Sequence, residues 1–67
     1  MITITLNGET RQFDPDLNLA QLVERLGHTG RRIAIERNGE IVPKGLHGET
    51  PLLAGDRLEI VVAVGGG

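Results

Sequence analysis

The chain has 67 residues, no cysteine, and Phe13 as its only aromatic residue. A chain of this length has room for one domain with a core of Ile, Leu and Val, and it offers neither a disulfide nor a thiolate metal site. Seven basic against nine acidic residues give a net charge of −2, and no basic cluster exceeds Arg31-Arg32, so we expect no nucleic-acid partner.

The first residues, MITITLNG, carry no basic leader and form too short an apolar run for a secretory signal. No segment approaches the ~20 apolar residues that a membrane span needs. The missing cysteines are typical of a reducing compartment. We therefore expect a soluble, cytoplasmic protein that has no membrane partner.

The start of the chain predicts a β-hairpin. Apolar and polar residues alternate over 2–6 and are followed by an Asn-Gly pair at 7–8, which is the strongest short-range hairpin signal. A second strand is expected over 9–13. Its register stays open, because a two-residue turn places Glu9 on the apolar face whereas a bulged turn places Thr10 there.

A short helix is predicted next. Four apolar residues have the spacing of a one-sided helix: Leu19, Leu22, Val23 and Leu26. Asn18 is placed to cap this helix, and Gln21 can complete a capping box. Leu17 can pack onto the first turns as a hydrophobic staple, and Gly27 can take the left-handed conformation that ends the helix.

The second half of the chain returns to strands. A strand is centred on Ile33 and Ile35, a second Asn-Gly turn lies at 38–39, and a short strand ends at Pro43. We expect an ordered loop with at most one helical turn over 44–56, followed by the last strand. This order indicates an α+β β-grasp (ubiquitin-like) fold, a mixed sheet of about five strands with one helix packed on one face.

The last strand, RLEIVVAV, links the fold to a function. Its inward face is predicted to carry four apolar residues: Leu58, Ile60, Val62 and Val64. On the opposite face Val61 and Ala63 are also apolar, which indicates a docking surface for a partner. The alternative is that the loop over 44–53 covers them.

No other cluster in the sequence predicts catalysis. His28 and His47 stand in separate predicted loops without the spacing of a zinc site or of a general base, so we expect solvated loop histidines. The remaining glycines occur singly and form no phosphate-binding loop. The protein is therefore expected to have no catalytic residue and no metal site, and not to be an enzyme.

Nearly the whole chain resembles the ThiS family, the sulfur carriers of thiamine biosynthesis. The matching stretches are ITLNGE, AIERNGEIVPK and LLAGDRLEIVVAV, together with the final glycines. The resemblance implies a single β-grasp domain over 1–64 and a flexible glycine tail over 65–67. The family requires two terminal glycines, so Gly65 is an additional spacer before Gly66 and Gly67.

The resemblance also implies a chemistry for Gly67. An α-carboxylate with a pKa of about 3.3–3.7 is ionised at neutral pH and must be activated before sulfur can replace its oxygen. In the family a ThiF-like adenylyltransferase, related to ubiquitin-activating enzymes, adenylates this carboxylate with ATP and Mg. Sulfur from a cysteine persulfide then gives a thiocarboxylate, which a ThiG-like thiazole synthase uses to build the thiazole ring. The carrier itself, expected to be monomeric, binds no cofactor, and Gly65 and Gly66 thread the partner active sites.

Three other interpretations stay open from the sequence. The small subunit of molybdopterin synthase has the same fold and the same thiocarboxylate chemistry. A ubiquitin-like modifier would join Gly67 to lysine side chains of target proteins. A plain interaction module would not need the glycines at all.

Overall fold

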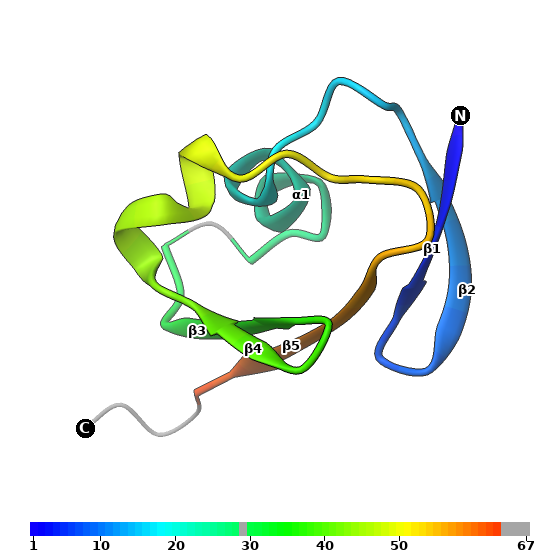
Figure 1. Cartoon of the computed structure of the whole chain (residues 1–67). Coiled ribbons are helices and arrows are strands. Elements are labelled where there is room, and N and C mark those ends of the chain that lie inside the picture. Colours follow the sequence, from blue (N-terminus) through cyan, green and yellow to red (C-terminus); the bar gives the residue numbers. More distant parts are fainter. Residues whose placement is uncertain (29, 64–67) are drawn as a thin grey trace.

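The computed structural model describes residues 1–28 and 30–63, which form a sheet and two helical segments (Figure 1). In chain order the elements are β1 (Ile2–Leu6), β2 (Glu9–Phe13), the α-helix α1 (Leu19–Arg25), β3 (Ile33–Arg37), β4 (Glu40–Val42), the 3-10 helix η1 (Lys44–Glu49) and β5 (Arg57–Val62). The predicted strands and the predicted helix are all present. The predicted tail over 65–67 lies outside the described residues.

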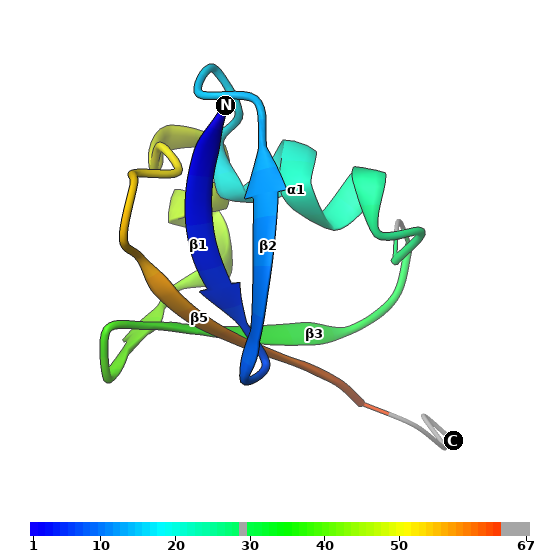
Figure 2. The ribbon, with the colours of Figure 1, turned by 90° about the vertical axis from the view of Figure 1, so that its right-hand side faces the viewer.

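The five strands form one mixed sheet in the order β2-β1-β5-β3-β4 (Figure 1). β1 and β5, which come from opposite ends of the chain, pair in parallel at the centre, and every other pairing is antiparallel. α1 packs on one face of this sheet, as the second view shows (Figure 2). This arrangement is a β-grasp fold and confirms the predicted fold class.

The register of the first hairpin follows from its turn. Leu6 pairs with Glu9 and Ile2 pairs with Phe13, so the turn has two residues and Glu9 lies on the apolar face. Asn7 and Gly8 both have positive φ, 49° and 83°, as a turn of this kind requires. The guanidinium carbon of Arg11 lies 5.6 Å from the centre of the Phe13 ring, so this polar residue covers the edge of the core.

α1 begins and ends where its capping residues predict. The Asn18 side chain accepts a hydrogen bond from the Gln21 N–H at 2.8 Å, and the Gln21 side chain accepts one from the Asn18 N–H at 2.9 Å. Gly27 follows the helix with φ 79°, a conformation that glycine adopts without steric cost. The capping box and the glycine stop are thus both confirmed.

The core lies between α1 and the inner face of the sheet. Leu17, Leu19 and Leu22 are buried at the start of α1, and the loop before β5 adds Leu52. The strands contribute six buried apolar residues: Ile4, Leu6, Phe13, Ile35, Leu58 and Ile60. The structure has no aromatic core apart from Phe13, so these aliphatic contacts account for most of the apolar burial.

The segment between β4 and β5 corrects two predictions. η1 has six residues, about two turns of 3-10 helix and so more than the one helical turn that we expected, and His47 within it is only 6% exposed. Its ring Nε2 lies 3.0 Å from the Val42 carbonyl oxygen, to which it donates a hydrogen bond. The prediction of a solvated loop histidine is wrong here, because η1 turns this side chain inward onto the end of β4. His28 is half-buried.

Candidate functional site

The final strand leaves the sheet with only one neighbour. β1 pairs with β5 at Arg57 and Leu58 and reaches no further. β3 continues alongside β5 as far as Val62, and beyond it the Ala63 N–H donates to the Arg32 carbonyl at 2.9 Å. The end of β5 is therefore a sheet edge that lacks a strand on the β1 side within the described part of the chain.

The side chain of Asn7 forms hydrogen bonds with the backbone of β5 on the side that faces β1. Its Oδ1 accepts a hydrogen bond from the Ile60 N–H at 2.8 Å, and its Nδ2 donates to the Ile60 carbonyl at 3.2 Å. The main chain turns away at Asn7, so the side-chain amide takes the position that the next backbone peptide of β1 would otherwise occupy. The strand is thus held at Ile60, one residue before the predicted docking surface begins.

The second Asn-Gly turn holds the beginning of the same strand. The Asn38 Oδ1 accepts a hydrogen bond from the Arg57 N–H at 2.9 Å, and the Asn38 N–H donates to the Arg57 carbonyl at 2.8 Å. The Asn38 Nδ2 also reaches the Asp56 Oδ1 at 3.3 Å. The sequence predicted both asparagines only as turn residues, because hydrogen bonds across 19 and 53 residues leave no local pattern.

Asp56 anchors β5 from a buried position. It is 4% exposed, and its Oδ2 accepts hydrogen bonds from the Arg37 Nε and from the Leu53 N–H, both at 3.0 Å. Burial alone would raise the pKa of this carboxyl group. The hydrogen bonds from Arg37, Leu53 and Asn38, with the charge of Arg37, outweigh burial and lower the pKa of Asp56 below its ordinary value.

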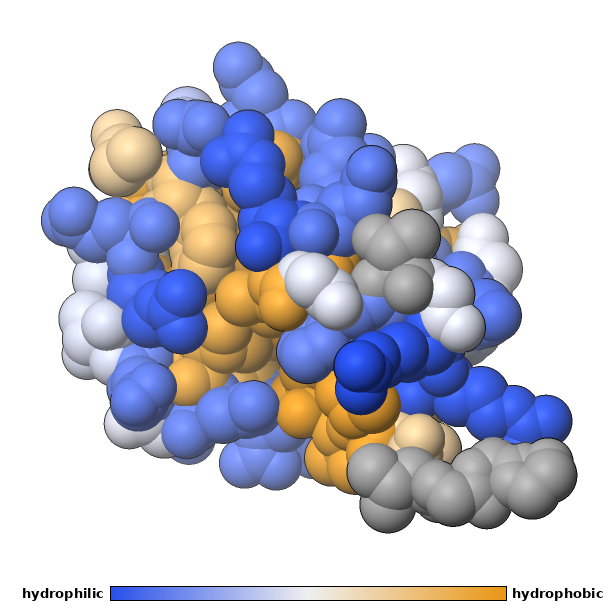
Figure 3. Space-filling view, turned by 180° about the vertical axis from the view of Figure 1, so that it is seen from behind, coloured by the Kyte–Doolittle hydropathy of each residue, from blue (hydrophilic) through white to orange (hydrophobic). Residues whose placement is uncertain are grey.

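Val61 and Ala63 lie on the face of the sheet opposite α1. Val61 is 63% exposed and Ala63 is also exposed, so the alternative that the loop over 44–53 covers them is wrong. Seen from behind, apolar surface lies near the end of the described chain (Figure 3). A role in docking remains a prediction for these two residues.

Other residues join Val61 on this outer face. Ala34 is its partner on β3, and Glu36 and Glu59 form the next pair along the same two strands. Ile41 lies opposite Glu36 on β4 and is 64% exposed. We call these five residues, Ala34, Glu36, Ile41, Glu59 and Val61, the outer sheet face.

The described residues offer neither a metal centre nor a membrane-crossing helix. Nowhere in 1–28 and 30–63 do three His, Asp or Glu side chains gather closely enough to hold a metal ion. No helix in these same ranges has the length and apolar character needed to cross a membrane. The predicted attachment residue Gly67, with Gly65 and Gly66, lies outside the described residues.

Two kinds of sequence relatives resemble this chain. Thiazole synthase from Paramagnetospirillum magneticum is 42% identical over 64 residues, and thiazole synthase from Magnetococcus marinus is 36% identical over 64 residues. The chain spans only 20% of the length of each. The uncharacterized protein ycf40 of Porphyra purpurea is 38% identical over 66 residues and is matched over 93% of its length.

Solved structures and a family profile both match this chain over nearly its whole length. The crystal structure of a thiamine biosynthesis protein (ThiS) from Geobacter metallireducens is similar with a TM-score of 0.82 and 28% identity, over 98% of this chain and all of that one. A solution structure of a thiamine biosynthesis protein from the same organism gives a TM-score of 0.79, with coverage of 98% and 88%. The profile of the ThiS family matches residues 4–67. The chain therefore belongs to the ThiS family.

Proposed function

We propose that this protein carries sulfur as a thiocarboxylate on Gly67 and delivers it for the synthesis of the thiazole ring of thiamine. The observation that carries the proposal is the family match over residues 4–67, which includes all three final glycines. The fold adds a physical reason, since β5, the strand that precedes the glycines in the sequence, is the central strand of the sheet and is held in place on both sides. The protein acts as a co-substrate of partner enzymes and not as a catalyst.

The chemistry begins with activation of the carboxylate. A Gly67 carboxylate oxygen attacks the α-phosphorus of ATP on a ThiF-like adenylyltransferase, and pyrophosphate leaves with its charge balanced by Mg²⁺ of that enzyme. The product is an acyl-adenylate, whose AMP is a good leaving group. Since the free carboxylate is ionised at neutral pH, this activation is required before any sulfur transfer.

Sulfur transfer then replaces AMP. The terminal sulfur of a cysteine persulfide attacks the acyl carbon, forms a C–S bond and expels AMP, which leaves an acyl disulfide. A thiol reductant supplies two electrons that cleave the S–S bond, so that the thiocarboxylate remains on Gly67. Because the chain has no cysteine, its terminus is the position at which it can hold sulfur.

Glycine suits the segment that enters the partner enzymes. Without Cβ atoms, Gly65, Gly66 and Gly67 can pass through a narrow channel, and free φ and ψ angles let one segment fit two different active sites. Val61 and Ala63 would then contact the partner surface around the channel. Their exposure on a strand that leads directly into the glycines supports this role.

Thiazole synthase is the sulfur acceptor that we propose. In two relatives of that name, the counterpart of this chain makes up a fifth of a longer polypeptide. Parts that are fused in one protein and separate in another are expected to work together. Because activation consumes ATP, we place the reaction in the cytoplasm.

Alkylation of the native protein tests the proposal. A thiol-directed reagent applied to protein from its own cells has no cysteine to modify, so an adduct located on Gly67 by fragment mass spectrometry identifies the thiocarboxylate. The same spectrum shows whether the native chain ends at Gly67. If no adduct forms when the adenylating enzyme, ATP and a persulfide donor are all supplied, the carrier function is wrong.

A further inference from the structure

We propose that Glu36 and Glu59 together bind one cationic side chain of thiazole synthase when that enzyme covers the outer sheet face. This inference rests on the proposed function and adds to it a charge contact that is separate from the apolar contact of Val61. It concerns the affinity and the specificity of docking and no step of the sulfur chemistry.

The two glutamates lie directly opposite each other on neighbouring antiparallel strands. At the ends of β3 and β5, two opposed pairs of residues are joined by backbone hydrogen bonds: Arg32 with Ala63, and Asn38 with Arg57. Hydrogen-bonded and non-hydrogen-bonded pairs alternate along antiparallel strands, so the pair Glu36 and Glu59 is also of the hydrogen-bonded type. In such pairs the Cα atoms are about 5.5 Å apart and the side chains rise on the same face. Like charges in this position destabilise a sheet.

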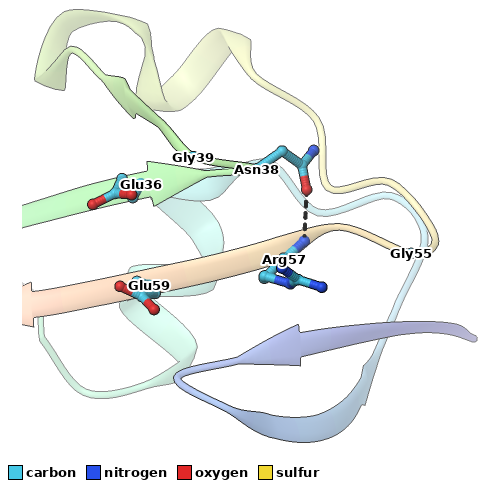
Figure 4. Close-up of a pocket in the computed structure, with 6 residues that line it drawn as sticks. All are labelled: Glu36, Asn38, Gly39, Gly55, Arg57 and Glu59. Carbon is cyan, nitrogen blue, oxygen red and sulfur yellow. Dashed lines mark hydrogen bonds between the residues drawn. The ribbon is translucent and has the colours of Figure 1, made fainter.

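Neither glutamate takes part in an ion pair within the described part of the chain. The two ion pairs found there join Arg25 to Asp14 and Arg37 to Asp56, and neither includes Glu36 or Glu59. Arg57 lies on the same face, but its side chain extends away from the two carboxylates, toward Gly55 (Figure 4). The two carboxylates are therefore open to a cation from outside.

The surroundings of the pair favour a protein partner over a solvated ion. Val61 and Ile41 are 63% and 64% exposed and flank the two carboxylates, and Ala34 is exposed beside Val61. A partner that covers these apolar side chains removes water from around the carboxylates, which strengthens a charge contact between them and a cation. A guanidinium fits best, because its fork of N–H donors can reach two carboxylates at once.

Thiazole synthase is the partner that we assign to this face. In the two fused relatives four-fifths of the polypeptide lies outside the segment matched by this chain, and the inner sheet face is already covered by α1. β5 carries both Glu59 and Val61 and leads toward the glycines. An enzyme that receives the glycine segment is therefore brought against the outer sheet face.

Charge-neutral variants test the inference. Glu36→Gln, Glu59→Gln and the double variant are compared with Glu9→Gln, which removes the same charge from the opposite face of the sheet, where Glu9 pairs with buried Leu6. Binding to thiazole synthase is measured by calorimetry at low and at high salt. We expect a loss of affinity of about fivefold for each single variant and of about tenfold or more for the double variant, with a weaker salt dependence.

A second measurement on the same variants, their stability in urea, gives a result that a purely structural role of the glutamates would not produce. Because the repulsion in the free protein is removed, Glu36→Gln and Glu59→Gln should unfold at a higher urea concentration than the native protein, while their binding becomes weaker. Glu9→Gln should leave the affinity within about twofold of the native value.

Two outcomes overturn the inference and differ in what they say of the proposed function. If the double variant binds as tightly as the native protein while Val61→Asp does not bind, the glutamates play no part and the docking of the carrier stands. If the native protein neither binds thiazole synthase nor forms a thiocarboxylate, the inference fails together with the proposed function.

Discussion

The side-chain amide of Asn7 bonds both backbone groups of Ile60, accepting from the N–H at 2.8 Å and donating to the carbonyl at 3.2 Å. The amide thereby extends the pairing of β1 and β5 by one position after the main chain of β1 has turned away. In sequence the two residues are 53 positions apart. A residue of the first hairpin turn thus sets how far the last strand is bonded on its β1 side, while β3 continues beside it to Val62.

Replacing Asn7 should weaken the attachment of β5 on its β1 side. Asn7→Gly removes both hydrogen bonds without backbone strain, because glycine tolerates the φ of 49° at this position. We expect a loss of about 1–2 kcal/mol in the free energy of unfolding, measured by urea denaturation. Amide hydrogen exchange at Ile60 should become faster.

Asn7→Asp is the matched control for this prediction. It retains an oxygen that can accept from the Ile60 N–H and loses only the donor to the Ile60 carbonyl, so it should protect the Ile60 amide better than Asn7→Gly does. Equal exchange at Ile60 in both variants and in the native protein would show that the asparagine amide does not hold the strand.

Asp56 should make the stability depend on acid pH. Its pKa in the folded protein lies below the ordinary value, so its stabilising contribution is fully present above the unfolded pKa of about 3.9. It is lost as the pH falls through the still lower folded pKa, since the protonated carboxyl loses its charge contact with Arg37. The free energy of unfolding, measured from pH 6 to pH 2, should fall in this range.

Asp56→Asn removes the titrating group and nearly keeps its shape. This variant should lose about 2–3 kcal/mol at pH 7, because the buried position then lacks a charged acceptor for Arg37 and the Leu53 N–H. Its stability should also change less with pH than that of the native protein below pH 4. A variant whose acid profile matches the native one would assign the pH dependence to other carboxylates.

Local sequence patterns predicted most of the fold. The helix followed from the spacing of Leu19, Leu22 and Val23 and from the capping pair Asn18 and Gln21, whose interactions span only a few residues. The two turns followed from their Asn-Gly pairs, because both positions of such a turn need a positive φ, as the structure shows. Such features could be predicted because each depends on neighbours within one or two turns of the chain.

Long-range interactions explain what the sequence did not predict. His47 was expected in solvent, and only the packing of η1 against the end of β4 places its ring against the Val42 carbonyl. The opposition of Glu36 and Glu59, which are 23 positions apart in the sequence, depends on the register of β3 and β5, which no local pattern sets. The predicted docking residue Val61 is exposed, and docking at Val61 and sulfur attachment at Gly67 stay predictions.

A charge at Val61 should impair docking while leaving the fold intact. The side chain is 63% exposed, so Val61→Asp should change the free energy of unfolding by no more than about 0.5 kcal/mol. Affinity for thiazole synthase should fall by about tenfold or more, because a desolvated carboxylate would replace an apolar contact. Titration calorimetry measures the loss.

Leu46→Asp is the control for Val61→Asp. Leu46 is 47% exposed on η1, away from the outer sheet face, and its replacement introduces the same charge in place of an apolar side chain. The affinity of this variant should stay close to the native value. Equal losses for both variants would point to a general effect of charge and would remove the argument for a docking surface at Val61.

A single methyl group at Gly67 should block the carrier reaction. Gly67→Ala adds a Cβ beside the carboxylate that the adenylyltransferase must accept, so the rate of pyrophosphate release per carrier should fall by about tenfold or more. Urea denaturation should show unchanged stability. Gly45→Ala is the control, because its φ is not positive and an added Cβ there meets nothing within 4 Å, so adenylation should proceed as in the native protein. Native rates for Gly67→Ala would show that the partner does not read the last residue closely and would count against activation at this position.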